Sequence, residues 1–149
     1  MRNSGSRVIK LLLLTFVSLL FTTSQSMPAM AGQFPSSDGG GLSVDWSGQW
    51  DNVHRLEDIA VQLCDHNTRD SNEAIARLQV MLINSAGESA QALAPVIMRV
   101  ERYAANCKAY KNMYLGYSEP LAWVRVMYYG STDGTKYYTK WVKNPFGNS

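Results

Sequence analysis

The fold is decided by the stretch SNEAIARLQVMLINSAGESAQALAPVIMRVERYAANCKAYKNMYLGY, residues 71–117. Its first part, from Ser71 to about Ser85, carries apolar side chains three and four residues apart, the spacing of one face of an α-helix. These side chains are Ala74, Ile75, Leu78, Met81 and Leu82, with Val80 and Ile83 widening the stripe. The pattern predicts a helix that is buried on more than one side and ends at Gly87.

The second part, from Ser89 to Leu115, continues the helical spacing. Its apolar and aromatic members are Leu93, Val96, Ile97, Val100, Ala104, Cys107, Tyr110 and Tyr114. Pro95 has no backbone N–H to donate, and its ring clashes with the preceding helical turn. We therefore expect this helix to be kinked, or to start afresh, near Pro95.

A similar pattern precedes the stretch and predicts another helix from about Ser47 to Cys64. The members of its apolar face are Trp50, Val53, Leu56, Ile59, Ala60, Leu63 and Cys64. Ser47 is a suitable N-cap, and Asp51 lies in the first turn, where a negative charge is favourable. Together the segments predict a three-helix layer.

The two cysteines, Cys64 and Cys107, are predicted to form one disulfide. Exported proteins reach oxidising compartments, where such bonds persist. Closing a loop of about 44 residues stabilises a chain by about 4 kcal/mol in the chain-entropy model. The alternative is a metal site built from Cys64, His66 and Cys107, but it needs a fourth ligand that the sequence does not indicate. We therefore expect no metal and no other cofactor.

Two runs rich in aromatic and β-branched residues, 121–129 and 135–142, predict a C-terminal antiparallel hairpin. The dipeptide Asp133-Gly134 between them is a strong turn signal. A turn there pairs even positions of one strand with odd positions of the other, which places on the helices Val124, Val126, Tyr128, Tyr137, Thr139 and Trp141. The opposite face carries Trp123, Arg125, Met127, Tyr129, Lys136, Tyr138, Lys140 and Val142.

The N-terminus has the features of a secretory signal peptide, residues 1–31. Arg2, Arg7 and Lys10 precede an apolar run, and Ala29 and Ala31 form an A-x-A cleavage site. The alternative is an uncleaved anchor, although the apolar run is short for a membrane helix. Residues 32–46, rich in glycine and serine, are expected to be a flexible leader, and residues 47–149 a single α+β domain. Cleavage would leave no stable membrane anchor, and the protein is expected in the periplasm or outside the cell.

Charge is distributed unevenly along the chain. Three of the fourteen basic residues lie in the signal peptide, so the mature chain has eleven basic residues and twelve acidic ones. From Arg102 to the end there are seven basic residues and only two acidic ones, Glu119 and Asp133. This asymmetry predicts a basic C-terminal surface, whereas a slightly acidic, exported chain argues against a nucleic-acid partner.

No motif in the sequence indicates catalysis, since it has no nucleophile elbow, P-loop or dinucleotide fingerprint. Aromatic, methionine and arginine side chains are typical of binding surfaces, and the predicted surface is Trp123, Arg125, Met127, Tyr129, Lys136, Tyr138 and Lys140. Ordinary strand packing would give the same composition. The expected function is non-catalytic binding of an acidic protein or an anionic envelope component, as an accessory, inhibitor or immunity component of a bacterial envelope or secretion system. The alternative is a small cell-wall (peptidoglycan) hydrolase using Glu88, Glu101 or Glu119.

Overall fold

A computed structural model describes residues 30–67, 72–101, 106–132 and 134–147 of the chain. These residues form two antiparallel β-sheets and contain no helix. The predicted α+β fold with its three-helix layer is therefore wrong. The described residues accordingly include no helix long and apolar enough to cross a membrane. The predicted signal peptide, residues 1–31, lies outside the described residues except for its last two positions.

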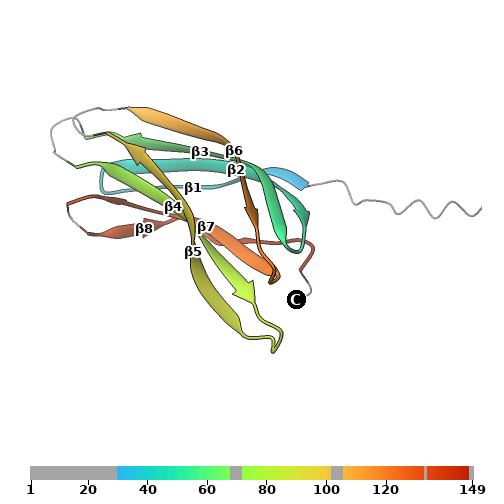
Figure 1. Cartoon of the computed structure of the whole chain (residues 1–149). Helices are drawn as coiled ribbons and strands as arrows, with labels where there is room; N and C mark the ends of the chain where they lie inside the picture. Colours follow the sequence, from blue (N-terminus) through green and yellow to red (C-terminus); the bar gives the residue numbers. More distant parts are fainter. Residues whose placement is uncertain (1–29, 68–71, 102–105, 133, 148–149) are drawn as a thin grey trace, which may run out of the picture.

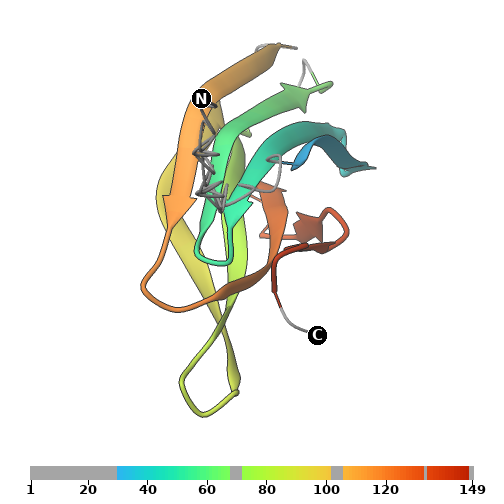
Figure 2. The same cartoon turned by 90° about the vertical axis from the view of Figure 1, so that its right-hand side faces the viewer.

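The chain forms a β-sandwich whose two sheets pack face to face (Figures 1 and 2). Sheet A has the strand order β1-β2-β3-β6, and sheet B has the order β5-β4-β7-β8, with β9 also pairing with β7. Both views show the tip of the β4–β5 hairpin projecting beyond the rest of the sandwich. The strands are β1 (Met30–Gly39), β2 (Leu42–Asn52), β3 (Arg55–Asp65), β4 (Ala74–Ile83), β5 (Ser89–Val100), β6 (Cys107–Gly116), β7 (Leu121–Gly130), β8 (Lys136–Tyr138) and β9 (Val142–Lys143).

The core lies between the sheets and is built from alternate residues of both inner faces. Sheet A contributes Leu42, Val44, Trp46, Trp50, Leu56, Ile59, Val61, Leu63 and Leu115. Sheet B contributes Ala74, Ala76, Leu78, Val80, Ala94, Met98, Val100, Leu121, Val124, Val126 and Tyr128. Each of these side chains is at most 5% exposed, so burial of this apolar surface stabilises the fold.

Strand β4 shows why a helix was predicted where a strand forms. Its inner face is the strict alternation Ala74, Ala76, Leu78 and Val80, all buried. The outer positions Ile75 and Met81 are apolar as well. Arg77 and Gln79 lie between them on the outer face. With apolar residues on both faces, the strand contains apolar spacings of three and four as well as two, so it matches the helical period as easily as the strand period.

A β-bulge in β3 produces the same false signal. Leu56 and Ile59 are both fully buried although they are three residues apart. The register between β3 and β6 shifts at this point, and Asp58 has a positive φ of 48°. The extra residue of the bulge shifts the inward-facing positions along β3 by one. Two consecutive buried residues are then three positions apart, which is a spacing typical of a helix.

Pro95 lies in an irregular part of the edge strand β5. The β4–β5 register shifts by two residues between the pairs Gln79 with Leu93 and Arg77 with Ile97. Proline is tolerated at bulges and on edge strands because no ladder hydrogen bond is needed from it there. The predicted kink near Pro95 is thus an interruption of a strand.

Residues 32–46, predicted as a flexible leader, form β1 and the first part of β2. Gly40 and Gly41 are the turn between these strands, with φ values of 61° and 76°. Two consecutive positive φ angles define the hairpin turn whose twist suits the flanking strands, and glycine adopts them without strain. The glycines therefore join two strands of the domain.

The C-terminal hairpin forms as predicted near its turn and departs from the prediction further along. Tyr128 pairs with Tyr137, and Tyr128 is fully buried. Beyond Thr139 the register shifts by one residue, because Val124 pairs with Val142. Val142 consequently packs on the core, whereas Trp141, predicted for the core, stacks on a side chain of the opposite face. Asp133 of the predicted turn lies outside the described residues.

The predicted disulfide between Cys64 and Cys107 is present. The two residues are direct partners in the β3–β6 ladder, so the bond joins adjacent strands of sheet A and not two helices. Their Cα atoms are 4.0 Å apart, slightly closer than the usual range of about 4.4 to 6.8 Å. A disulfide is consistent with an oxidising compartment such as the periplasm or the cell exterior.

Candidate functional site

The predicted binding residues of β7 share the outer face of sheet B. The inward positions Val124, Val126 and Tyr128 are buried in the core. The intervening residues, Trp123, Arg125, Met127 and Tyr129, therefore point away from the core. Trp123, Arg125 and Tyr129 are partly exposed there, whereas Met127 is covered and only 5% exposed. Cross-strand pairing places Tyr138 beside Met127 and Lys136 beside Tyr129. The structure thus brings together all the predicted surface residues except Lys140, which is exposed between β8 and β9 without a ladder partner that would fix its face.

Strands β4 and β5 extend this surface well beyond the predicted hairpin. Residues of β4 lie beside those of β7 in the ladder: Ile75 with Tyr129, Arg77 with Met127, Gln79 with Arg125 and Met81 with Trp123. The next strand, β5, adds Gln91, Leu93, Ile97 and Arg99. The sequence interpretation missed these residues because it assigned them to helices. The alternation in β4 was the signal that would have found them.

The outer face of sheet B is defined by these residues of β4, β5, β7 and β8, and its sheet carries most of the exposed large hydrophobic side chains of the described residues. Among the described residues, the large hydrophobic side chains that are most exposed are Leu93 at 40%, Val96 at 39%, Ile97 at 43%, Tyr114 at 67% and Tyr138 at 39%. All of them except Tyr114 belong to β5 or β8 of this sheet. Contiguous exposed apolar side chains are typical of interaction sites.

Arginine side chains are distributed among these apolar groups. The Nη2 atom of Arg77 donates to the carbonyl of Ala94, at 2.9 Å, across the interruption in β5. Arg99 pairs with Glu73 at 2.6 Å, at the end of the face. Arg125 lies in the middle of β7, and partial burial lowers the pKa of its guanidinium. The face therefore combines apolar contact area with positive charge.

Trp141 belongs to this face as well. The guanidinium carbon of Arg125 lies 4.2 Å from the centroid of the Trp141 ring and 4.0 Å from that of the Tyr138 ring. Lys143 lies 5.9 Å from the centroid of the Trp123 ring. The one-residue register shift after Thr139 thus transfers a tryptophan from the predicted core to the outer surface.

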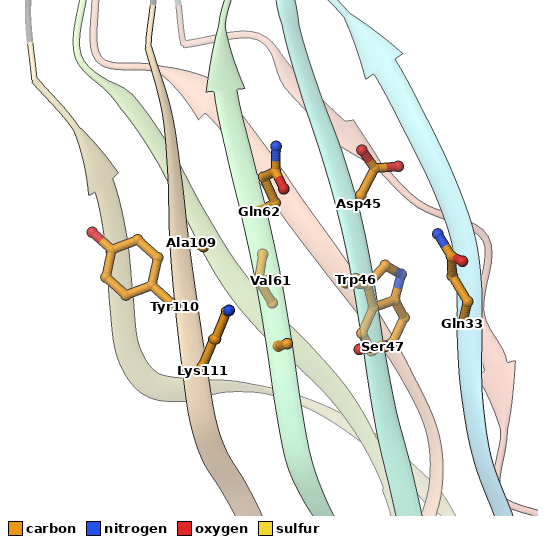
Figure 3. Close-up of a pocket in the computed structure, with 10 residues that line it drawn as sticks. Gln33, Asp45, Trp46, Ser47, Val61, Gln62, Ala109, Tyr110 and Lys111 are labelled. Carbon is orange, nitrogen blue, oxygen red and sulfur yellow. The ribbon is translucent and has the colours of Figure 1, made fainter.

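A concave feature lies on the outer face of sheet A (Figure 3). It is an open hollow of about 230 Å³. Gln33, Asp45, Gln62 and Lys111 project around it from four neighbouring strands. Of its two aromatic neighbours, Trp46 is 2% exposed and packs in the core, and Tyr110 is partly buried against the core. The hollow mixes polar side chains with Ala60, Ala109 and Tyr110, but none of the most exposed large hydrophobic side chains of the described residues lines it. It is therefore a weaker candidate than the outer face of sheet B.

The cysteine and histidine residues form no metal site here. The sulfur atoms of Cys64 and Cys107 are bonded to each other, which leaves no thiolate ligand. His66 instead shares a hydrogen bond of 2.8 Å between its Nε2 and the hydroxyl of Ser43. Within the described ranges no group of three or more His, Cys, Asp or Glu side chains is arranged to hold a metal ion.

Comparison with known proteins adds no assignment. No protein-family model matches the chain, and no curated protein is similar to it in sequence.

Proposed function

We propose that the protein is an exported, non-catalytic binding module that docks an acidic protein partner on the outer face of sheet B. It would act in the periplasm or outside the cell, as an accessory, inhibitor or immunity component of a bacterial envelope or secretion system. The observation that carries this proposal is the concentration of exposed apolar side chains on one sheet face, with arginines among them.

The composition of this face favours a protein over an anionic polymer. Leu93, Ile97 and Tyr138 are exposed to a similar degree, and burying them stabilises a complex only if the partner supplies apolar surface too. A phosphate-rich polymer supplies charge without that surface.

The charge of the face favours an acidic partner. Arg77, Arg125 and Lys136 lie on it without an ion pair among the described residues, while Glu73 is engaged by Arg99. Opposite charge accelerates association, whereas like charges opposed across an interface disfavour it. A second copy of the chain docking through the same face would oppose these basic groups to one another.

The hydrolase alternative gains no support from the carboxylates that were considered for it. A general acid for glycoside cleavage needs a raised pKa. The Ser118 hydroxyl, which donates to Glu119 at 2.7 Å, instead lowers the pKa of Glu119. Glu88 and Glu101 are exposed, and Glu88 accepts a hydrogen bond from the side chain of Asn84.

Site-specific photo-crosslinking in cells tests the proposal. A benzoylphenylalanine replaces Ile97 on the outer face of sheet B, and in a matched variant it replaces Gln62, which is exposed on the outer face of sheet A. We expect a discrete adduct with an acidic protein from position 97 and none from position 62. Adducts only from position 62, or none from either position, would contradict the proposal.

A further inference from the structure

Arg125 is held in one position by three separate segments of sheet B. Its guanidinium lies between the rings of Tyr138 and Trp141, with its carbon 4.0 Å and 4.2 Å from their centroids. Its Nε atom donates to the Oε1 atom of Gln79 at 2.7 Å. The Nε2 atom of Gln79 in turn donates to Gln91 at 3.1 Å, which fixes the amide with its oxygen toward Arg125. The side chain is therefore oriented before any partner binds.

The positive charge of Arg125 has no carboxylate counterpart in the described part of the chain. The ion pairs found there join Arg55 to Glu57 and Arg99 to Glu73. The hydrogen bond to Gln79 uses Nε alone, and no acceptor among these residues engages the two terminal amino groups. The flanking rings also displace water from the guanidinium, consistent with its lowered pKa. A partly desolvated, unpaired guanidinium gains more from an ionic partner than a fully hydrated one does.

We propose that Arg125 is the anchor of the interface and binds an aspartate or glutamate side chain of the acidic protein partner. The inference rests on the proposed function and specifies which contact dominates it. The planar guanidinium matches a carboxylate through two parallel hydrogen bonds. Around it, Trp123 and Tyr138 supply the apolar surround that excludes water from such a contact.

The test uses the purified full chain and a labelled acidic polypeptide, the random copolymer of glutamate and tyrosine, with binding measured by fluorescence anisotropy at low salt. Arg125→Lys keeps the charge but loses the planar guanidinium, so we expect about a tenfold loss of affinity, which corresponds to about 1.4 kcal/mol. Arg55→Lys is the matched control, because Arg55 lies 6.0 Å from the Tyr114 ring on sheet A, and its affinity should not change.

A second variant separates the anchor from general loss of structure. Gln79→Ala keeps Arg125 and its charge but removes the acceptor at 2.7 Å that orients it. We expect a smaller loss of about threefold, because pre-organisation is lost while the contact remains possible. Thermal melting of each variant confirms that it is folded.

The possible outcomes distinguish failure of Arg125 as the anchor from failure of the outer face of sheet B as the binding surface. Unchanged affinity in Arg125→Lys, together with a loss in Ile97→Asp, would overturn the anchor and leave the proposed function standing. Absence of binding by the unmodified chain would overturn both. Equal binding of inorganic polyphosphate, lost equally in Arg125→Lys, would show that the site recognises an anionic polymer and would overturn the assignment to a protein carboxylate.

Discussion

Tyr137 lies against the turn that joins β1 to β2 and helps connect the two sheets. Its ring stacks on Tyr128 with centroids 5.6 Å apart. The Tyr128 hydroxyl forms a 2.8 Å hydrogen bond with the hydroxyl of Ser37 on β1. A Cβ added at Gly40 would come within 2.7 Å of the Tyr137 hydroxyl. Glycine is required there both by its positive φ and by this close approach.

Replacing Gly40 by alanine should therefore destabilise the fold. The positive φ costs about 1 to 2 kcal/mol for a residue with a Cβ, and the overlap with Tyr137 adds about 1 to 3 kcal/mol. In Gly116→Ala the new Cβ meets nothing within 4 Å, so its effect should stay within about 0.5 kcal/mol. Urea unfolding of the two variants is the measurement. Equal losses would show that Gly40 does not occupy the turn as described.

The buried Tyr128 makes stability depend on alkaline pH. Burial raises the pKa of its hydroxyl, and the hydrogen bond with Ser37 opposes this only in part. Because the folded state holds the proton more tightly than the unfolded state, this contribution is complete below the ordinary tyrosine value of about 10 and is lost as the pH rises above it. Burial of Tyr117 shifts its pKa in the same direction.

The variant Tyr128→Phe tests this dependence. Loss of the hydrogen bond with Ser37 should cost about 1 kcal/mol at about pH 8. The decline in unfolding free energy between about pH 8 and about pH 10.5 should be smaller than in the unmodified protein, with Tyr117 supplying the remainder. Urea unfolding at both pH values measures it. A decline as steep as that of the unmodified protein would exclude Tyr128 as its source.

Within the C-terminal hairpin, Tyr128 lies in the core, whereas the register shift places Trp141 on the outer face. Tyr128 is fully buried, so Tyr128→Ala should cost about 3 to 5 kcal/mol. Trp141 stacks on Arg125 on the outer face, so Trp141→Ala should cost only about 1 to 2 kcal/mol. Thermal melts of the two variants compare these losses. A larger loss for Trp141→Ala would place its ring in the core.

The disulfide ties β6, an edge strand in the described part of the chain, to its ladder partner β3. Reduction should cost about 2 to 4 kcal/mol overall. Since no other described strand pairs with β6, its amides should lose protection before those of β4, which is flanked by β5 and β7. Hydrogen exchange of the oxidised and reduced protein measures this order. Equal loss of protection in β4 and β6 would contradict it.

For the molecule as a whole, the features that the sequence predicted correctly have local causes. The hairpin follows from two adjacent runs of strand-forming residues, and the disulfide follows from having only two cysteines. Two strands of the sandwich resembled helices, because β4 carries the apolar residues Ile75 and Met81 on its outer face and β3 is bulged at Asp58. The alternation of buried Leu42, Val44 and Trp46 with the polar residues between them in β2 was a local strand signal that the sequence interpretation did not use. The β3–β6 and β4–β7 ladders, in contrast, join segments far apart in the chain.

The candidate surface was predicted only in part. Its β7 and β8 residues were recognised from the alternation within one hairpin. Leu93, Ile97 and Gln79 join it only because β4 and β5 pair beside β7. Sheet pairing, which the sequence interpretation did not foresee, thus extends a hairpin face across β4 and β5.

The central claim is that the outer face of sheet B, with Arg125 near its middle, is the binding surface. The most direct test is a nuclear magnetic resonance titration of the isotope-labelled protein with the copolymer of glutamate and tyrosine. We predict that the amide shifts will be confined to β4, β5, β7 and β8 and be largest around Arg125 and Tyr138. Shifts centred on the sheet A hollow, around Asp45 and Gln62, or spread evenly over both sheets would contradict the claim.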